Sequence, residues 1–203
     1  GIRYNQVDLL PDGSVDWETV LEKLTPETKV VAIQRSRGYQ LRPSFTIAEI
    51  ADMVRRVRQI APRAVIFADN CYGEFVERME PTEVGVDLIA GSLIKNPGGG
   101  IVPSGGYIAG RRELVERAAW RLTVPGLGGE VGAMLGTTRA MFQGLFLAPH
   151  FVGQAVKGAI WSSALLERLG FAVHPRWEDE RTDLIQAIRF DRAEQLIAFV
   201  QGI

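Results

Sequence analysis

The sequence has a single cysteine, almost no net charge and no long apolar run. Its 203 residues include only Cys71, so no disulfide bond can form within the chain. A formal net charge of -1 gives no electrostatic footprint for nucleic acid. No apolar run reaches the roughly 18–20 residues that a membrane span needs, and no acidic, histidine or cysteine residues cluster at metal-site spacing. We therefore expect a globular protein without nucleic-acid, membrane or metal partners.

The two ends of the sequence carry no targeting signal and no obvious boundary. Residues 1–4, Gly-Ile-Arg-Tyr, lack the basic and apolar regions of a signal peptide, so we expect a cytoplasmic protein. The chain begins without methionine and stops in or just after an amphipathic pattern at residues 193–203. We therefore expect a fragment, an internal piece of a longer protein.

Short apolar runs alternate with helical patterns in the first 122 residues. A capping box, Thr46 to Glu49, opens an amphipathic helix over residues 46–60. Strands with little polar alternation, separated by helices, are typical of an α/β fold with a mostly parallel sheet and helices on both faces. The expected strands are 29–34, 64–68, 87–90 and 105–109, and the other expected helices are 17–24 and 111–122.

The pattern changes after Pro125, where glycines precede a helix-rich stretch. The expected helix over residues 149–169 is apolar on more than one face, which is typical of a fully buried helix or of a helix at a subunit interface. We predict an incomplete large domain over residues 1–170 and the start of a small α+β domain over residues 171–203. The elements expected here are helices 131–146 and 149–169, ended by Gly170, strands 171–174 and 184–190, and a helix opened by an Asp191–Glu194 capping box.

Reactive side chains follow two of the expected strands. Asp69 ends one apolar run, and Ser92 and Lys95 follow another, just before Gly98. In open α/β sheets, ligands bind beyond the carboxyl ends of the strands. A P-loop is disfavoured because its glycines would precede the lysine. A lysine in this place can instead form a Schiff base with pyridoxal phosphate, in an arrangement where Asp69 suits the pyridinium nitrogen and Ser92 the phosphate.

The sequence around these residues resembles that of a known family. The Asp69-Asn70 pair, the step of 26 residues to Lys95 and the Ser92-x-x-Lys95 arrangement resemble the fold-type-I pyridoxal-phosphate enzymes of cysteine and methionine metabolism. The segments 33–39, 69–75, 92–100, 104–110 and 144–150 resemble a bacterial branch, called the methionine gamma-lyase family or aluminium-resistance proteins. The resemblance runs over nearly the whole chain.

This resemblance implies a fold, a cofactor and a reaction. It implies the large domain of a pyridoxal-phosphate-dependent transferase-like, aspartate-aminotransferase-type fold. It implies a carbon–sulfur lyase that acts on a sulfur amino acid by β- or γ-elimination, as a homodimer or homotetramer. Lys95 would be the Schiff-base lysine and the general base, with Asp69 on the pyridine nitrogen and Ser92 on the phosphate. We expect burial and a neighbouring cation to lower the pKa of Lys95 toward neutrality.

Two other readings remain open for the whole chain. The first is a catalytically incompetent fragment or a non-catalytic interaction module that retains the fold. The second is another lysine Schiff-base enzyme, such as an aldolase, although a (β/α)8 barrel would not leave the long helical stretch from 130 to 169.

Several further residues have two readings. Arg35 and Arg37, just past a strand end, suit either anion binding or structural salt bridges. Tyr72 suits either the pocket or the core. The residues for which we favour a structural role are Cys71, Glu130, His150 and His174.

Overall fold

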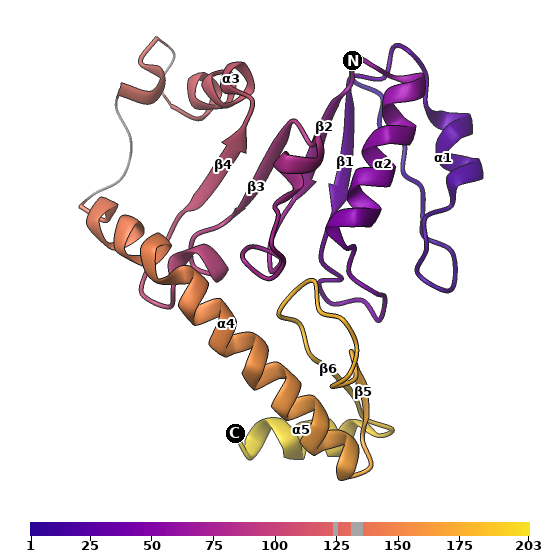
Figure 1. Cartoon of the computed structure of the whole chain (residues 1–203), viewed down its shortest axis with the longest axis vertical. Helices are drawn as coiled ribbons and strands as arrows, with labels where there is room; N and C mark the ends of the chain where they lie inside the picture. The colour runs from indigo at the N-terminus through magenta and orange to yellow at the C-terminus, as the bar shows by residue number, and fades with distance from the viewer. Residues whose placement is uncertain (124–125, 131–135) are drawn as a thin grey trace.

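A four-stranded sheet forms the first half of the molecule (Figure 1). The structure is a computed structural model of the whole chain, and it describes residues 1–123, 126–130 and 136–203. The strands stand in the order β1 (Val30–Gln34), β2 (Val65–Asp69), β3 (Leu88–Ser92) and β4 (Gly106–Gly110). β1, β2 and β3 are parallel, and β4 is antiparallel to β3. The α/β class with a mostly parallel sheet is thereby confirmed.

The strand register brings three carboxyl ends together. Gln34 at the end of β1 pairs with Asp69 at the end of β2. Asp69 in turn pairs with Ala90, two residues before the end of β3. Polar side chains at the ends of these strands therefore meet at one edge of the sheet, where an open α/β sheet binds its ligands.

Two helices precede and follow β1, and both begin at side-chain caps. α1 (Trp17–Lys23) starts at Asp16, whose carboxylate accepts a hydrogen bond from the Thr19 amide. α2 (Ile47–Ile60) starts at Thr46, whose hydroxyl accepts from the Glu49 amide while the Glu49 carboxylate accepts from the Thr46 amide. The predicted capping box is confirmed.

The core lies between α2 and one face of the sheet. The apolar stripe of α2 includes Ile50 and Val57, which pack with Ile66 from β2. Full burial of such a side chain contributes about 1.5–3 kcal/mol, so this layer is the main source of stability. A 3-10 turn, η1 (Pro81–Val84), connects β2 to β3 beside α2. On the opposite face, Ala32 is exposed and Phe67 is only partly buried.

α4 (Thr138–Arg168) is one continuous helix, where two helices separated near Pro149 were expected. Gly144, Ala148 and Val152 are buried at a spacing of four residues. They form a stripe that spans both sides of Pro149. A Cβ atom on Gly144 would lie 2.4 Å from the Gly98 carbonyl oxygen, so the helix and the 96–100 turn approach very closely. This packing keeps the helix intact despite the lost backbone donor.

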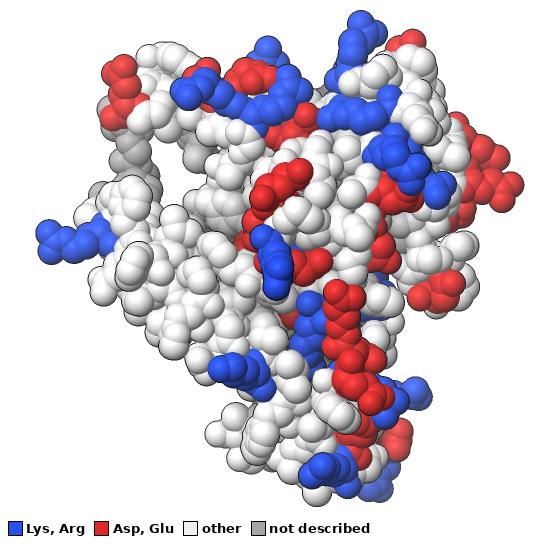
Figure 2. Space-filling view, in the orientation of Figure 1, with Lys and Arg blue, Asp and Glu red and all other residues white. Residues whose placement is uncertain are grey.

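Of the two alternatives for the 149–169 helix, full burial is contradicted, and the subunit interface stays a prediction. Apolar side chains along α4 face outward, and Phe146 and Trp161 are 85% and 66% exposed. Figure 2 shows few charged side chains over this helix. Residues 131–135 of the expected 131–146 helix lie outside the described residues. Among the residues that the structure describes, no helix has the length and apolar character for crossing a membrane.

The remaining elements of the first half are short. α3 (Arg112–Leu122) follows β4 and contacts it. Two further 3-10 turns are η2 (Asn96–Gly98), which carries the glycine-rich segment after Lys95, and η3 (Gly128–Glu130). η2 packs against α4, so the turn after Lys95 is held between the sheet and the long helix.

A second, two-stranded sheet follows α4. β5 (Ala172–His174) is antiparallel to β6 (Ala187–Arg189). Gly170, with a φ of 89°, ends α4 as expected. The expected strand over 184–190 is shorter than predicted, because the Leu184 amide donates to the Tyr72 carbonyl at 3.2 Å instead of joining a ladder.

The last helix also differs from the expectation. α5 (Ala193–Gln201) begins after Arg192, and the predicted Asp191–Glu194 capping box is wrong. The Arg192 amide instead donates to the Gln195 side chain at 3.3 Å. The helix therefore begins one residue later than predicted, and Gln195 takes the place that Glu194 was expected to have.

Candidate functional site

Asp69 presents an unpaired carboxylate at the end of β2. Side chains alternate along a strand, so Asp69 lies on the face opposite to Ala68 and the α2 core. Its Oδ1 atom accepts a hydrogen bond from the Cys71 amide at 3.1 Å. In the described part of the chain, no lysine or arginine forms an ion pair with Asp69, and its Oδ2 atom has no hydrogen-bond partner. One carboxylate oxygen is thus available to a ligand.

Lys95 follows β3 and precedes the turn η2. Its Nζ atom lies 4.3 Å from the centroid of the Tyr72 ring. Burial lowers the pKa of the Lys95 amine, but contacts with Tyr72 and Cys71 outweigh burial and raise the pKa overall. The predicted lowering of the Lys95 pKa is therefore contradicted in this chain, since Tyr72 and Cys71 favour the charged amine.

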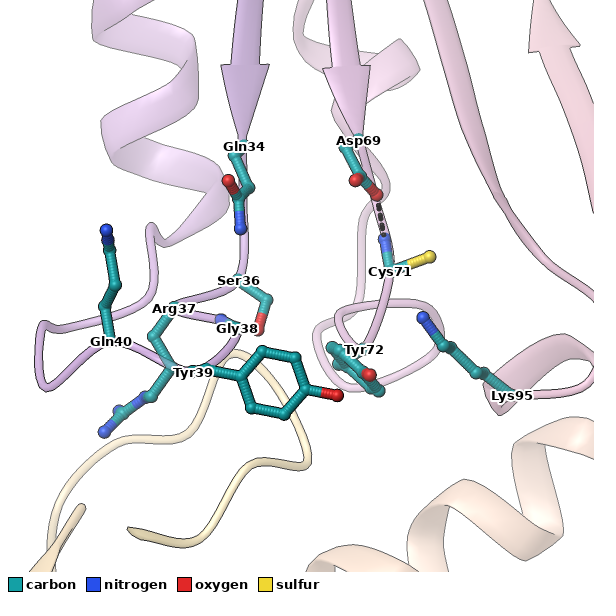
Figure 3. Close-up of a pocket in the computed structure, with 10 residues that line it drawn as sticks. All are labelled: Gln34, Ser36, Arg37, Gly38, Tyr39, Gln40, Asp69, Cys71, Tyr72 and Lys95. Atoms are coloured by element: carbon teal, nitrogen blue, oxygen red, sulfur yellow. Dashed lines mark hydrogen bonds between the residues drawn. The ribbon is translucent and has the colours of Figure 1, made fainter.

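Asp69 and Lys95 line the same cavity, as Figure 3 shows. Its volume is about 400 Å³, within the usual range for small-molecule sites. Ser92 is not among its lining residues. That serine lies two residues beyond Ala90 on the same face of the sheet, and its hydroxyl accepts a 3.4 Å hydrogen bond from the Ile94 amide. The lining residues are Gln34, Ser36, Arg37, Gly38, Tyr39, Gln40, Asp69, Cys71, Tyr72 and Lys95.

The loop that follows Asp69 has an unusual backbone. Tyr72 and Phe75 have φ angles of 71° and 62°, in the left-handed region that aromatic residues rarely adopt. The Phe75 amide donates to Glu80 Oε1 at 2.8 Å. Such conformations persist only where surrounding contacts hold them, and they concentrate at functional sites. The loop is therefore shaped by its surroundings.

Arg35 holds this loop through ion pairs and a hydrogen bond. It is fully buried and forms ion pairs with Glu77 at 2.8 Å and Glu80 at 3.4 Å. Its Nη1 atom also donates to the Asn70 side-chain oxygen at 2.8 Å. Of the two readings that the sequence left open for Arg35, the structure supports the structural ion pair. The neighbour of Asp69 in the sequence, Asn70, is thereby fixed.

Glu74 is a second buried acid in the loop. Its Oε1 atom accepts a hydrogen bond from the Tyr107 hydroxyl at 2.8 Å, and its Oε2 atom is buried without a described partner. Burial raises the pKa of Glu74 to about 7, with Glu80 adding to the rise and Arg35 opposing it. This side chain changes charge near neutral pH, two residues after Tyr72, which lines the cavity.

Arg37 points away from Asp69 and Lys95, toward the segment that joins the second sheet (Figure 3). It is 3% exposed, and its Nη1 atom donates to the His174 carbonyl at 3.2 Å. Burial lowers the pKa of Arg37, and Asp183 opposes that effect. Arg37 therefore lines the cavity but makes its described hydrogen bond to the second sheet.

Asp183 connects the loop after β1 to the segment before β6. Its Oδ2 atom accepts hydrogen bonds from Ser36 at 2.6 Å and from Ser44. Its Oδ1 atom accepts from the Ile185 amide at 3.0 Å. Because Ser36 also lines the cavity, the second sheet is tied directly to one wall of the candidate site.

The residues for which a structural role was favoured lie in different surroundings. Burial raises the pKa of Cys71, so its thiol stays protonated, although it lines the cavity. His150 packs edge-on against the Phe151 ring, and Glu130 is exposed. In the described residues, no three histidine, cysteine, aspartate or glutamate side chains gather as a metal site requires.

Sequence reasoning overlooked five lining residues, Gln34, Ser36, Gly38, Tyr39 and Gln40. Gln34 had a usable signal, since it ends an apolar run just as Asp69 does. Tyr39 had none, because it belongs to an irregular loop and is fully exposed.

A family model described as methionine gamma-lyase matches residues 1–203. The Bacillus subtilis (strain 168) protein YnbB is 52% identical over 202 residues, covering 100% of this chain and 48% of its own length.

Two solved structures are close in fold and sequence. One, from Listeria innocua, is provisionally described as a cystathionine beta-lyase involved in aluminum resistance. It is 54% identical with a TM-score of 0.95, over 98% of this chain and 49% of its own. The other, from Clostridium novyi NT, is described as a carbon-sulfur lyase involved in aluminum resistance. It is 48% identical with a TM-score of 0.92, over 100% of this chain and 48% of its own. The chain thus spans about half the length of these relatives, and its fold is that of the fold-type-I pyridoxal-phosphate enzymes.

Proposed function

Because this chain belongs to the methionine gamma-lyase family, we propose that it forms the central part of the cofactor-binding region of a pyridoxal-phosphate-dependent carbon–sulfur lyase. The proposed substrate is a sulfur amino acid, and the proposed reaction is a β- or γ-elimination. The descriptions of the Listeria innocua and Clostridium novyi NT proteins support a lyase. The chain spans about half of each, so the proposal concerns the protein to which these residues contribute.

The residues of the cavity fit pyridoxal phosphate. The free Oδ2 atom of Asp69 is a suitable partner for a protonated pyridine nitrogen. Lys95 supplies an amine on the same cavity, and the Tyr72 ring lies beside that amine. Ser92, on the same face of the sheet as Asp69, is the proposed phosphate ligand, and this role stays a prediction.

When bound, the cofactor supplies a ring that takes up the electron pair left by the substrate α-proton. Within the chain, Lys95 would hold the cofactor covalently and then carry the α-proton. Asp69 would keep a proton at the pyridine nitrogen, because an adjacent carboxylate favours the charged ring. A β- or γ-substituent of the amino acid, a thiol, would then leave.

The single observation that carries this proposal is that Asp69 and Lys95 line the same cavity. They come from consecutive parallel strands and line one cavity, with one carboxylate oxygen unpaired within the described residues. An unpaired acid beside an amine is expected to form an ion pair unless a ligand belongs between the two groups. The structure leaves both groups on the wall of one cavity of about 400 Å³ without a described ion pair between them.

The binding of pyridoxal phosphate tests the proposal. We expect the purified chain to develop a visible absorbance band with added pyridoxal 5′-phosphate, and Lys95→Ala to abolish it. The matched control is Lys157→Ala, which removes an exposed lysine on α4 and should leave the band unchanged. Because contacts raise the Lys95 pKa, the band should form faster as pH rises and the amine deprotonates.

The substrate class requires the longer protein. A screen of that protein with cysteine, methionine and cystathionine should release thiol from at least one of them, and Lys95→Ala should abolish the release. If the chain takes up no cofactor and the longer protein releases no thiol, the alternative applies, a non-catalytic module that retains the fold.

A homodimer or homotetramer is also part of the proposal. It is supported by the exposed apolar side chains of α4, including Phe146 and Trp161. Contiguous exposed apolar surface commonly marks a contact with another chain.

A further inference from the structure

Asn96, the residue after Lys95, joins the two halves of the candidate site. It is 7% exposed, although an asparagine in a turn is usually solvated. Its Nδ2 atom donates hydrogen bonds to the Tyr72 carbonyl and to the Glu74 carbonyl, each at 3.0 Å. An amide nitrogen carries two hydrogens, so both donors are used on the loop that follows Asp69.

The Tyr72 carbonyl is a junction of three segments. It accepts hydrogen bonds from Asn96 Nδ2 and from the Leu184 amide at 3.2 Å. Leu184 follows Asp183, which is held by Ser36 in the cavity wall. The turn after β3, the loop after β2 and the segment before β6 therefore meet at one oxygen atom.

The same loop carries the strain. Tyr72 lies in the left-handed region with a φ of 71°, which is strained for a residue other than glycine. In this conformation the Tyr72 ring lies 4.3 Å from Lys95 Nζ. The two Asn96 hydrogen bonds hold the carbonyls on each side of Gly73, so they oppose relaxation of this strain.

The backbone of Lys95 is fixed in the same turn. Its amide donates to the Ser92 carbonyl at 3.4 Å, and its carbonyl accepts from the Gly98 amide at 2.9 Å. Any movement of Asn96 relative to Tyr72 therefore moves Lys95 relative to the Asp69 loop. No other side chain among the described residues donates to the Tyr72 or Glu74 carbonyl.

We propose that Asn96 is a positioning residue that sets the distance and orientation between Lys95 and the Asp69 loop by clamping the carbonyls of Tyr72 and Glu74. This inference rests on the proposed function for its catalytic meaning. The clamp itself is a property of the chain, and it can be measured without cofactor.

The single cysteine provides a direct readout of the clamp. Cys71 lies between Asp69 and Tyr72, lines the cavity and is partly buried. In Asn96→Asp, a carboxylate replaces the donor and faces two carbonyl oxygens, and in Asn96→Ala both donors are removed without added charge. Each variant should speed the reaction of Cys71 with dithiobis(nitrobenzoate) by about tenfold, as expected for the loss of two hydrogen bonds. Asn5→Asp makes the same chemical change at an exposed site and should leave the rate unchanged.

A second readout separates positioning from mere stability. With added pyridoxal 5′-phosphate, the pH midpoint of the visible absorbance should shift by about half a unit or more in Asn96→Ala, because the surroundings of Lys95 change. Urea unfolding of each variant shows whether it is folded, and Asn96→Ala is the variant to use if Asn96→Asp does not fold.

The outcomes are distinct. Faster Cys71 modification together with a shifted midpoint supports the clamp. An unchanged Cys71 rate, or a lowered unfolding midpoint with the absorbance midpoint unchanged, overturns it. If the unaltered chain develops no absorbance, it does not bind the cofactor by itself, and the Cys71 rates alone decide whether Asn96 holds the loop.

Discussion

The sheet region and the α4 region of this molecule use apolar side chains in opposite ways. Between α2 and the sheet, Ile50 and Ile66 are fully buried. Along the 31 residues of α4, only four are buried, while Phe146 is 85% exposed. The first region thus carries its own core, whereas the apolar surface of the second remains available for contact with another chain.

The two regions also differ in how many charged and polar side chains they bury. Arg35, Glu74 and Asp87 are buried beneath or beside the sheet, each with hydrogen-bond partners. α4 contributes one buried polar side chain, Ser163, which donates to the Pro175 carbonyl. Buried polar groups are costly unless they are satisfied. Arg35 and Glu74 contact or belong to the loop after β2, whose first residues line the cavity, so their burial indicates that precise positioning matters in this loop. The following predictions test this contrast, from the largest effect to the smallest.

A core substitution in the sheet region should have the largest effect. Ile66→Ala should lower the free energy of unfolding by about 2–5 kcal/mol, since it leaves a cavity in a fully packed site. Ile197→Ala, at a 54% exposed position of α5, should change it by about 0.5 kcal/mol or less. Urea unfolding of both variants measures the difference. Equal effects would contradict the claim that the core lies in the sheet region.

The connection between the sheet region and the second sheet should be the next most sensitive point. The buried arginines Arg37, Arg42 and Arg181 form no described ion pair, and Asp183 is the acid whose charge favours their charged forms. Asp183→Asn should therefore lower the free energy of unfolding by about 2–3 kcal/mol. Asp191→Asn, at an exposed position, is the control. An unchanged unfolding midpoint for Asp183→Asn would show that the connection contributes little.

Glu74 should give the sheet region a stability that depends on pH. Its folded pKa of about 7 lies above the ordinary 4.5, so the folded state binds a proton that the unfolded state has lost. Stability from this group is then full below about pH 4.5 and is lost as pH rises through 7. Glu74→Gln keeps an acceptor for Tyr107 and cannot ionise.

The free energy of unfolding of Glu74→Gln should exceed that of the unaltered chain by about 1–2 kcal/mol at pH 8 and should be close to it at pH 5. Unfolding curves at both pH values measure the difference. A constant offset between the two proteins would show that Glu74 does not titrate between these values.

The smallest effect on stability should come from the exposed face of α4. Phe146→Ser should change the free energy of unfolding by about 0.5 kcal/mol or less, because the side chain is already in solvent. It should weaken self-association, measured by sedimentation velocity over a range of concentrations. Leu10→Ser, at a 43% exposed position that is distant from α4 in the sequence, should leave self-association unchanged. Equal association in all three proteins would remove the α4 face from the proposed interface.

The sheet and the placement of Asp69 and Lys95 could be predicted from local signals. Short apolar runs predicted the strands, and strand ends predicted where polar residues meet. The Thr46 capping box was also predictable, because both partners lie within four residues. These features depend on periodicity and on neighbouring residues, which a single sequence displays directly.

The errors arise where distant contacts override local signals. Pro149 predicts a break, but buried Ala148 and Val152 hold the two turns of α4 in line against the η2 turn. Leu184 looks like part of a strand, but its amide is taken by Tyr72, more than one hundred residues earlier. Asn96 could not be recognised from the sequence either, since its two acceptors are carbonyl groups of a strained loop.

The central claim is that Asp69 and Lys95 are two halves of one cofactor site. The most direct measurement is borohydride reduction of the chain with pyridoxal 5′-phosphate, followed by peptide mapping of its four lysines, Lys23, Lys29, Lys95 and Lys157. The account predicts a label concentrated on Lys95 and reduced by Asp69→Asn. A label spread evenly over the four lysines, or one on Lys95 that Asp69→Asn leaves unchanged, would contradict it.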